Sequence, residues 1–233
     1  RLSPAERTAY DKILSFLVFL DSIQTANLPH IGEYITANEV NLCLSIQTFQ
    51  ECVHSQSYSY MLDTICNPTE RDAIIYFYSG FMFFYNLSRN GKMPGSAQEI
   101  RYINRDENTH LWLFRNIILE LQKEEPELFT PENIAVLKEM LEEGVCQEID
   151  WGHYCIGNAI PVLTKDMITD YIHYLGNLRW TSLGYEPLYP GHTAEPESMA
   201  WVSQYSNANM VKTDFFEAKS TAYAKSTALV DDL

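Results

Sequence analysis

The sequence has little positive charge and no long apolar run. Its 16 lysines and arginines stand against 31 acidic residues, which gives a formal net charge of −15. Nucleic-acid-binding proteins carry a basic face, so this balance argues against that class. The longest apolar stretch, residues 13–20, contains Ser15 and is followed by Asp21, and it is shorter than the roughly 18 residues that indicate a membrane span. We expect no nucleic-acid partner and no membrane.

The five cysteines form no Cys-x-x-Cys pair, and most of them lie in segments with a helical pattern. An odd number of cysteines without paired spacing indicates reduced thiols. The sequence shows no signal peptide. Together these features predict a cytoplasmic protein.

Alternation typical of strands is scarce, whereas signals that begin helices recur. Ser3, Thr36 and Ser96 each open a capping box, with glutamate three residues later. Thr130 and Thr164 each precede a further helical segment. The predicted helices cover about 3–23, 36–65, 73–87 and 96–122, a fifth that opens at 130, and 164–183. Long helices with short connections favour an all-α helical bundle.

Two segments carry the pattern Glu-x-x-His, Glu51–His54 and Glu107–His110. Residues three apart share a helix face, so each pair can offer a carboxylate and an imidazole to one ion. Such ligands suit iron or manganese, and two such motifs on facing helices are typical of di-iron bundles. The first motif lies among apolar residues: Leu42, Leu44, Ile46, Phe49 and Val53. The competing interpretation is that all four are ordinary polar residues of a surface or core.

Asp21 and Tyr58 extend this pattern. Asp21 follows an apolar stretch, and burying such an acid is costly unless it is paired or bound to a metal. The alternative is an exposed position on an amphipathic helix. Tyr58 lies four residues after His54 and seven after Glu51, on the same helical face and one turn further along. A redox metal can oxidise a phenol there, although Tyr58 can also be an ordinary core residue among 15 tyrosines.

Together these segments resemble the small subunit of ribonucleotide reductase, and the resemblance spans nearly the whole chain. It rests on LDSIQ at 20–24, ECVHSQSY at 51–58, FYSGF at 77–81, RDENTH at 105–110, and DFFE at 214–217 followed by Tyr223. The resemblance implies a ferritin-like di-metal carboxylate helical bundle in residues 1–197. It also implies a C-terminal tail, residues 198–233, for docking to the large subunit and for radical transfer.

The resemblance also implies a ligand set. Asp21, Glu51 and His54 would hold one metal ion, and Glu107 and His110 the other. The pair would be iron, manganese or a manganese–iron mixture.

Three further roles follow from the same resemblance. Tyr58 would be oxidised to a stable radical, Asp106 would connect a ligand histidine to the radical-transfer path, and Tyr223 would relay the radical to the large subunit. The apolar pocket around the radical would consist of Phe77, Phe81 and Ile103.

The implied activity is that of a ribonucleoside-diphosphate reductase beta subunit, an oxidoreductase that is active only with its large subunit. It would form a homodimer and serve deoxyribonucleotide synthesis for DNA replication. Two alternatives remain: a related di-metal oxidase that binds an organic ligand in a large apolar pocket, and a ferritin-like metal-binding bundle. A catalytically inert relative is a further one.

The sequence departs from the family's pattern between Tyr58 and Phe77. The family has a further glutamate ligand four residues before the Phe77-Tyr78 pair, where this sequence has Ala73. The family also has a longer segment here, about a helix pair. Either a segment of the natural protein that holds the glutamate is omitted near residues 72–75, or a true deletion leaves the site incomplete.

Overall fold

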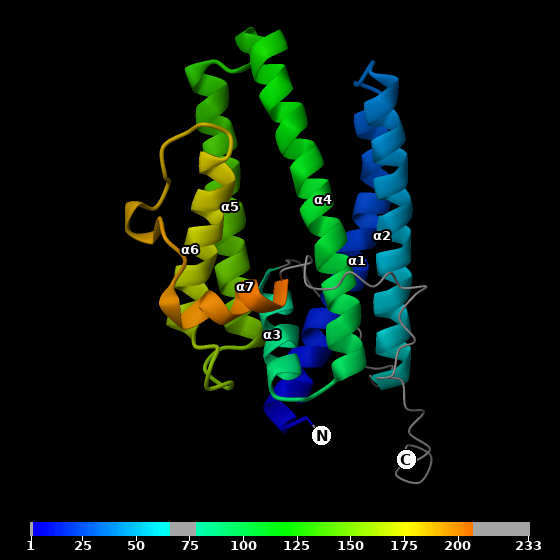
Figure 1. Ribbon diagram of the computed structural model, residues 1–233, viewed down its shortest axis with the longest axis vertical. Helices are drawn as coiled ribbons and strands as arrows, with labels where there is room; N and C mark the ends of the chain where they lie inside the picture. Colours follow the sequence, from blue (N-terminus) through cyan, green and yellow to red (C-terminus); the bar gives the residue numbers. More distant parts are fainter. Residues whose placement is uncertain (1, 66–77, 207–233) are drawn as a thin grey trace.

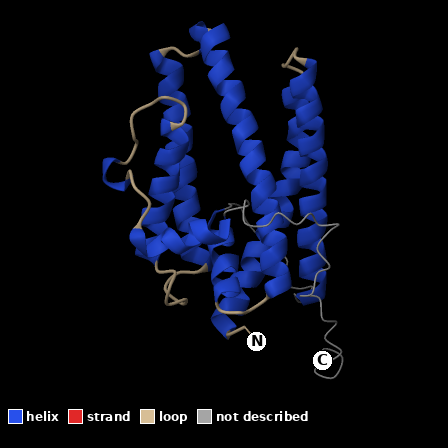
Figure 2. Cartoon of the chain, viewed as in Figure 1, coloured by secondary structure: helices blue, strands red, loops and turns tan. Residues whose placement is uncertain are grey.

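The computed structural model describes residues 2–65 and 78–206, so Ala73, Phe77 and Tyr223 lie outside the described residues. This part of the chain contains helices and loops and no strand (Figure 2), which confirms the all-α prediction. The α-helices are α1 (Pro4–Gly32), α2 (Asn38–Ile65), α3 (Tyr78–Arg89), α4 (Pro94–Glu124), α5 (Pro131–Cys155), α6 (Lys165–Thr181) and α7 (Ala200–Ser206). The short 3-10 helices are η2 (Pro126–Leu128), η3 (Pro190–His192) and η4 (Glu197–Met199).

Three of the predicted caps are confirmed. The Ser3 hydroxyl accepts from the Glu6 backbone N–H at 3.3 Å, and the Glu6 carboxylate accepts from the Ser3 N–H at 2.7 Å. Thr130 and Thr164 cap α5 and α6 in the same way, each accepting from the backbone N–H three residues later. These side chains satisfy N–H groups that have no partner within the helix.

Three predicted boundaries are wrong. Helix α4 begins at Pro94 and not at Ser96, because Met93 precedes a proline and takes a left-handed conformation, with φ 47°. Helix α2 begins at Asn38, two residues after Thr36, and α1 continues nine residues past Ile23 to Gly32. The extension of α1 contains no helix breaker before its last turn.

The long helices form two groups (Figure 1). Helices α1 and α2 lie side by side as one pair and α5 and α6 as another, with α4 between the pairs. Aromatic side chains connect α1 to the short helix α3 and to α5: Tyr10 packs on Phe84 with ring centroids 5.1 Å apart, and Phe16 on Trp151 at 5.3 Å. Edge-to-face packing of this kind fixes the helices relative to one another.

Helix α7 crosses the lower part of the bundle and packs on α3 and α4. Met199 and Val202 are buried in the same core as the long helices. The first residues after position 197 therefore lie on the bundle. The predicted division of the chain at 197/198 stays a prediction.

None of the described helices combines the length and the apolar composition of a membrane span. Four cysteines fall in the described ranges, Cys43, Cys52, Cys146 and Cys155, and all four are free thiols.

Candidate metal centre

The structure brings together all five residues for which a metal-binding role was predicted. Asp21 comes from α1, Glu51 and His54 from α2, and Glu107 and His110 from α4. They form two groups, one of Asp21, Glu51 and His54 and one of Glu51, Glu107 and His110, and within each group the possible ligand atoms lie within 4.8 Å of one another. Glu51 belongs to both groups. Asp21 is completely buried, so its exposed alternative is wrong.

The inner atoms of these side chains lack hydrogen-bond partners among the described residues. They include both carboxylate oxygens of Asp21 and the Nδ1 atoms of His54 and His110. His54 Nδ1 lies 3.2 Å from Glu107 Oε1, yet both atoms remain without a hydrogen bond. Buried polar atoms without partners are costly, and carboxylates and imidazoles that converge in this way are typical of a cation site. Three carboxylates and two imidazoles fit a pair of iron or manganese ions.

The outer nitrogen of each ligand histidine has a different partner. His54 Nε2 donates to Asp106 Oδ2 at 3.1 Å, and Arg105 donates to the other oxygen of the same carboxylate at 3.1 Å. Asp106 therefore contacts a predicted ligand. His110 Nε2 donates to Gln50 Oε1 at 2.9 Å. Sequence reasoning missed Gln50, whose only signal is its place directly before Glu51.

Without metal, protons occupy this centre. Burial raises the pKa of Asp21 to about 9, and the charge of Glu51 adds to the effect. Burial disfavours a charged imidazole, but the carboxylates of Asp106 and Glu107 outweigh it and raise the pKa of His54 to about 11. Burial also disfavours the charged form of His110, but the carboxylates of Glu107 and Glu51 outweigh it and raise the pKa of His110 to about 9. Metal ions must displace these protons in order to bind.

We expect the metal-free protein to lose stability as the pH rises from about 6.5 to about 9. Folded His54 and His110 keep protons up to pKa values of about 11 and about 9, whereas unfolded histidine loses its proton near about 6.5. Folded Asp21 holds a proton that unfolded aspartate loses near about 3.9. The folded state therefore binds more protons throughout this window, and each such proton lowers the free energy of unfolding by about 1.4 kcal/mol per pH unit.

Urea unfolding at several pH values measures this trend. The metal-loaded protein is the control, and its midpoint should rise with pH because metal binding becomes stronger as protons leave. A midpoint of the metal-free protein that rose from pH 6.5 to 9 would contradict the protonation states assigned to the three side chains.

Tyr58 lies on α2, one turn beyond His54, and is completely buried. Burial, together with the carboxylate of Asp21, raises the pKa of Tyr58 well above its ordinary value. Its hydroxyl has no hydrogen-bond partner among the described residues. Phe81 and Ile103 are buried in the same core cluster as Tyr58. The phenol is therefore neutral and shielded from water.

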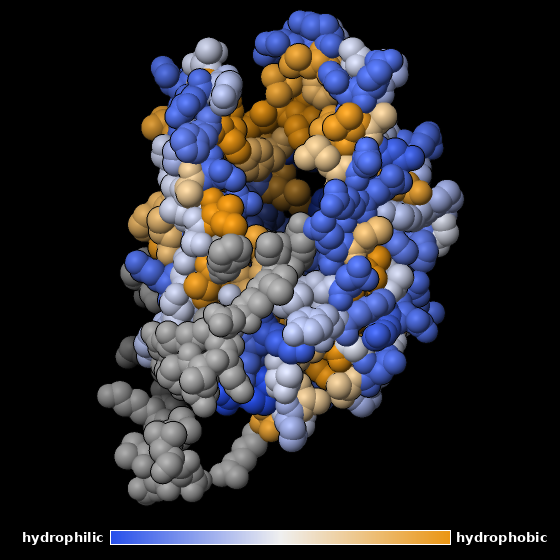
Figure 3. All heavy atoms as spheres, turned by 180° about the vertical axis from the view of Figure 1, so that it is seen from behind, coloured by the Kyte–Doolittle hydropathy of each residue, from blue (hydrophilic) through white to orange (hydrophobic). Residues whose placement is uncertain are grey.

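A cavity of about 210 Å³ borders the centre. Its lining consists of Gln24, Gln47, Glu51, Phe81, Glu107, His110, Leu111 and Phe114. Viewed from behind, the molecule is hollowed in its upper half, and hydrophobic side chains gather in the hollow (Figure 3). Pockets for organic ligands usually measure about 300–1,000 Å³. The small volume disfavours the alternative of an oxidase with a large apolar pocket.

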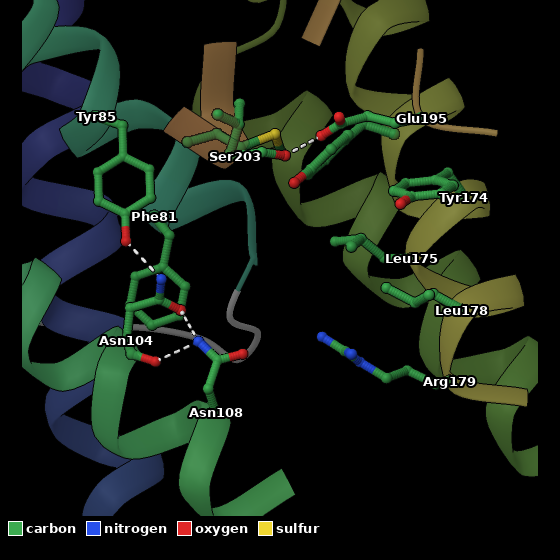
Figure 4. Close-up of a pocket in the computed structure, with 13 residues that line it drawn as sticks. Phe81, Tyr85, Asn104, Asn108, Tyr174, Leu175, Leu178, Arg179, Glu195 and Ser203 are labelled. Carbon is green, nitrogen blue, oxygen red and sulfur yellow. Dashed lines mark hydrogen bonds between the residues drawn. The ribbon is translucent and has the colours of Figure 1, made fainter. Parts of the chain in front are cut away.

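A second cavity, of about 190 Å³, lies between α3, α4 and α6, and Phe81 lines both cavities. Arg179 points from α6 toward Asn108 on α4 (Figure 4). On the α4 side, Asn104 donates to the Tyr85 hydroxyl at 2.6 Å, and Asn108 donates to the Asn104 carbonyl at 2.7 Å. The first hydrogen bond connects α4 to α3, and the second lies within α4.

Comparisons with known proteins give one consistent result. The family model for the ribonucleotide reductase small chain matches residues 1–76 and 73–196. The ribonucleoside-diphosphate reductase subunit beta of Treponema pallidum (strain Nichols) is 63% identical, with 100% of this chain and 79% of that protein covered. The subunit beta of Halalkalibacterium halodurans is 37% identical, with 97% and 78% covered. The solved R2 subunit from Clostridium botulinum matches with a TM-score of 0.82 and 43% identity, over 88% of this chain and 78% of that one.

The comparisons also bear on the departure near Ala73. The alignment with the Treponema pallidum protein extends over 277 residues, 44 more than the 233 residues of this chain. The two matches to the family model meet at residues 73–76. The omitted segment near residues 72–75 stays a prediction.

Proposed function

The chain belongs to the family of ribonucleotide reductase small chains, and from this premise we propose that its buried centre holds two redox-active metal ions that serve to oxidise Tyr58. It is a ribonucleoside-diphosphate reductase beta subunit, an oxidoreductase. The observation that carries the proposal is the convergence of five possible metal ligands from three helices, with the buried Tyr58 one turn beyond His54 on α2.

Each ligand side chain has a distinct place in this proposal. Asp21, Glu51 and His54 would hold one ion, and Glu51, Glu107 and His110 the other, with Glu51 shared. When bound, a dinuclear iron, manganese or mixed centre supplies the oxidising power for removal of one electron from a phenol. The protein would hold the ligand side chains in place and exclude water from the oxidised tyrosine.

Tyr58 is suited to storing an oxidising equivalent. Its complete burial keeps reductants and water away from the ring. Oxidation of a neutral phenol removes an electron and a proton, and the carboxylates that act most strongly on this hydroxyl are those of Asp21 and Glu107. We propose that this cluster takes up the proton while the electron passes to the metal centre.

Electron paramagnetic resonance tests the proposal. The metal-free chain is loaded with ferrous ion under anaerobic conditions and exposed to oxygen, and metal is counted in the same sample; manganese loading is run in parallel. We expect a tyrosyl signal and about two metal ions per chain. One ion or none, with no radical, would contradict the proposal and would make Ala73 a true defect.

We propose that the chain acts with a large subunit that binds and reduces the ribonucleotide. Asp106 contacts the ligand His54 on one side and Arg105, which is half exposed, on the other. Such a link suits passage of an electron and a proton between the buried centre and the surface. The predicted tail would dock on the large subunit through its residues beyond α7, and Tyr223 would relay the radical.

We also propose a homodimer formed through the outer face of α2. Large apolar side chains on this face are exposed: Leu42 67%, Ile46 61%, Phe49 68%, Val53 42% and Tyr60 60%. Their steps of three, four and seven residues form a heptad-like stripe, and a second copy offers the same stripe in a two-fold arrangement. Monomeric soluble proteins rarely expose a large contiguous apolar patch to water.

A charge on the stripe is expected to convert the dimer into a monomer. Phe49→Glu places a carboxylate at the centre of the stripe, where pairing would bring two such charges together without a partner. Sedimentation velocity measures the change in mass. Met140→Glu on α5 is the matched control, since Met140 is also exposed, at 64%, and that variant should keep the mass of the unaltered chain. A dimeric Phe49→Glu variant would exclude α2 as the interface.

A further inference from the structure

The two ligand histidines have similar neighbours at Nδ1, which faces the centre, and different hydrogen-bond partners at Nε2, which faces away from it. Each Nδ1 faces carboxylates: His54 Nδ1 lies 3.5 Å from Glu51 and 3.2 Å from Glu107, and His110 Nδ1 lies 3.3 Å and 3.4 Å from the same two side chains. On the outside, His54 meets the carboxylate of Asp106, whereas His110 meets the neutral amide of Gln50.

We propose that Gln50 is a positioning residue that fixes the ring form of His110 and sets the metal affinity of the Glu51, Glu107 and His110 site. The inference deepens the proposed di-metal function and rests on it. Gln50 does not touch the metal position and acts only through His110.

The hydrogen bond determines which ring nitrogen is free to bind metal. The amide oxygen of Gln50 can only accept, so the proton of neutral His110 must lie on Nε2. The lone pair of Nδ1 then points toward Glu51 and Glu107, where an ion would lie. If the amide were lost, the proton could move to Nδ1, and the ring could also rotate away from the carboxylates. Both changes weaken metal binding.

Gln50 also connects two helices across the centre. It lies on α2 directly before Glu51, while His110 lies on α4. The hydrogen bond of 2.9 Å therefore connects the helix that carries Glu51 to the helix that carries His110. His110 is 5% exposed, so water has little access to replace the amide.

The difference between an amide and a carboxylate makes the two sites unequal. Asp106 gives His54 a charge-assisted hydrogen bond, which strengthens the ring as a donor to metal more than a neutral amide does. Arg105 in turn holds Asp106 in place. Gln50 thus keeps the affinity of the His110 site below the value that a carboxylate at the same position would give it.

Titration of the metal-free full chain with Mn²⁺ alone tests this inference, with bound and free ion separated by electron paramagnetic resonance. The unaltered chain should bind two ions with unequal affinity. In Gln50→Leu, one affinity should stay the same and the other should fall about 10–100-fold. In Gln50→Glu, a carboxylate replaces the amide, and the weaker site should become at least as tight as in the unaltered chain.

Two controls separate positioning from a general loss of structure. Gln122 lies on α4, like His110, and donates to the Leu183 carbonyl and the Tyr185 hydroxyl. Gln122→Leu therefore removes comparable hydrogen bonds away from the centre and should change neither affinity. In a chain that already carries His110→Ala, Gln50→Leu should have no further effect on metal binding, because its route of action is gone.

The outcomes are distinguishable. Unchanged affinities in Gln50→Leu, or an equal fall at both sites, would overturn the role of Gln50. Failure of Gln50→Glu to restore the weaker site would overturn it as well, and this variant retains a polar side chain if Gln50→Leu fails to fold. Fewer than two ions on the unaltered chain would overturn the proposed function itself, and this inference with it.

Discussion

Glu51→Ala is expected to abolish the binding of both metal ions. Glu51 is the one residue shared by the two ligand groups that the described residues form. Its carboxylate is 2% exposed, and it lies 3.3 Å from His110 Nδ1 and 3.5 Å from His54 Nδ1. Loss of a residue behind a ligand weakens metal binding about 10–100-fold, so loss of a shared ligand should exceed that at both sites.

The metal-free state explains why no neighbour can compensate. The two histidines hold the pKa of Glu51 below its ordinary value against the opposing effect of burial, so the carboxylate is charged and ready to bind. Asp21 is the other acid of the group with Glu51 and His54, and burial, the largest cause of its raised pKa, remains when Glu51 is lost. Without Glu51, the centre has fewer negative charges to attract a cation.

Metal content after dialysis, with titration of Mn²⁺, measures the effect. Glu148→Ala is the matched control, because Glu148 is also a buried glutamate, 5% exposed on α5 and outside both ligand groups. That variant can lose stability but should keep its full metal content. Two ions bound by Glu51→Ala would contradict the assignment of Glu51 to both sites.

The grouping of each Glu-x-x-His pair was predictable from the sequence because its geometry is local. A spacing of three residues places Glu107 and His110 on one face in any helix. Asp21 was harder to predict, because its apolar neighbours alone left an exposed position open. The two Glu-x-x-His pairs favoured burial, and the structure places Asp21 at 0% exposure. These inferences need no knowledge of how distant helices pack.

Gln50 could not be predicted, because its partner His110 lies 60 residues away and the register between α2 and α4 depends on packing. The apolar residues around the first motif show the same limit. Leu44 is buried, at 3% exposure, whereas Phe49 is 68% exposed. Periodicity identifies an apolar face, but it does not tell whether that face packs within the chain or against another molecule.

Tyr58→Phe is expected to abolish the radical and leave metal binding intact. Phenylalanine keeps the ring that fills the core and removes one oxygen atom. That oxygen has no hydrogen-bond partner among the described residues, so its loss should change the free energy of unfolding by less than about 1 kcal/mol. Phenylalanine has no hydroxyl group, so it cannot form a neutral radical by loss of a proton and an electron.

Tyr85→Phe is the matched control, and it should show the opposite pattern. Tyr85 is also buried, at 1% exposure, but its hydroxyl accepts from Asn104 at 2.6 Å. Its loss leaves the Asn104 amide unpaired, which should cost about 1–3 kcal/mol while the radical yield stays unchanged. Radical spectra and urea unfolding of both variants therefore separate radical storage from a structural hydrogen bond. An undiminished radical in Tyr58→Phe would place the stored oxidant on another of the 15 tyrosines, whatever the effect of the two variants on stability.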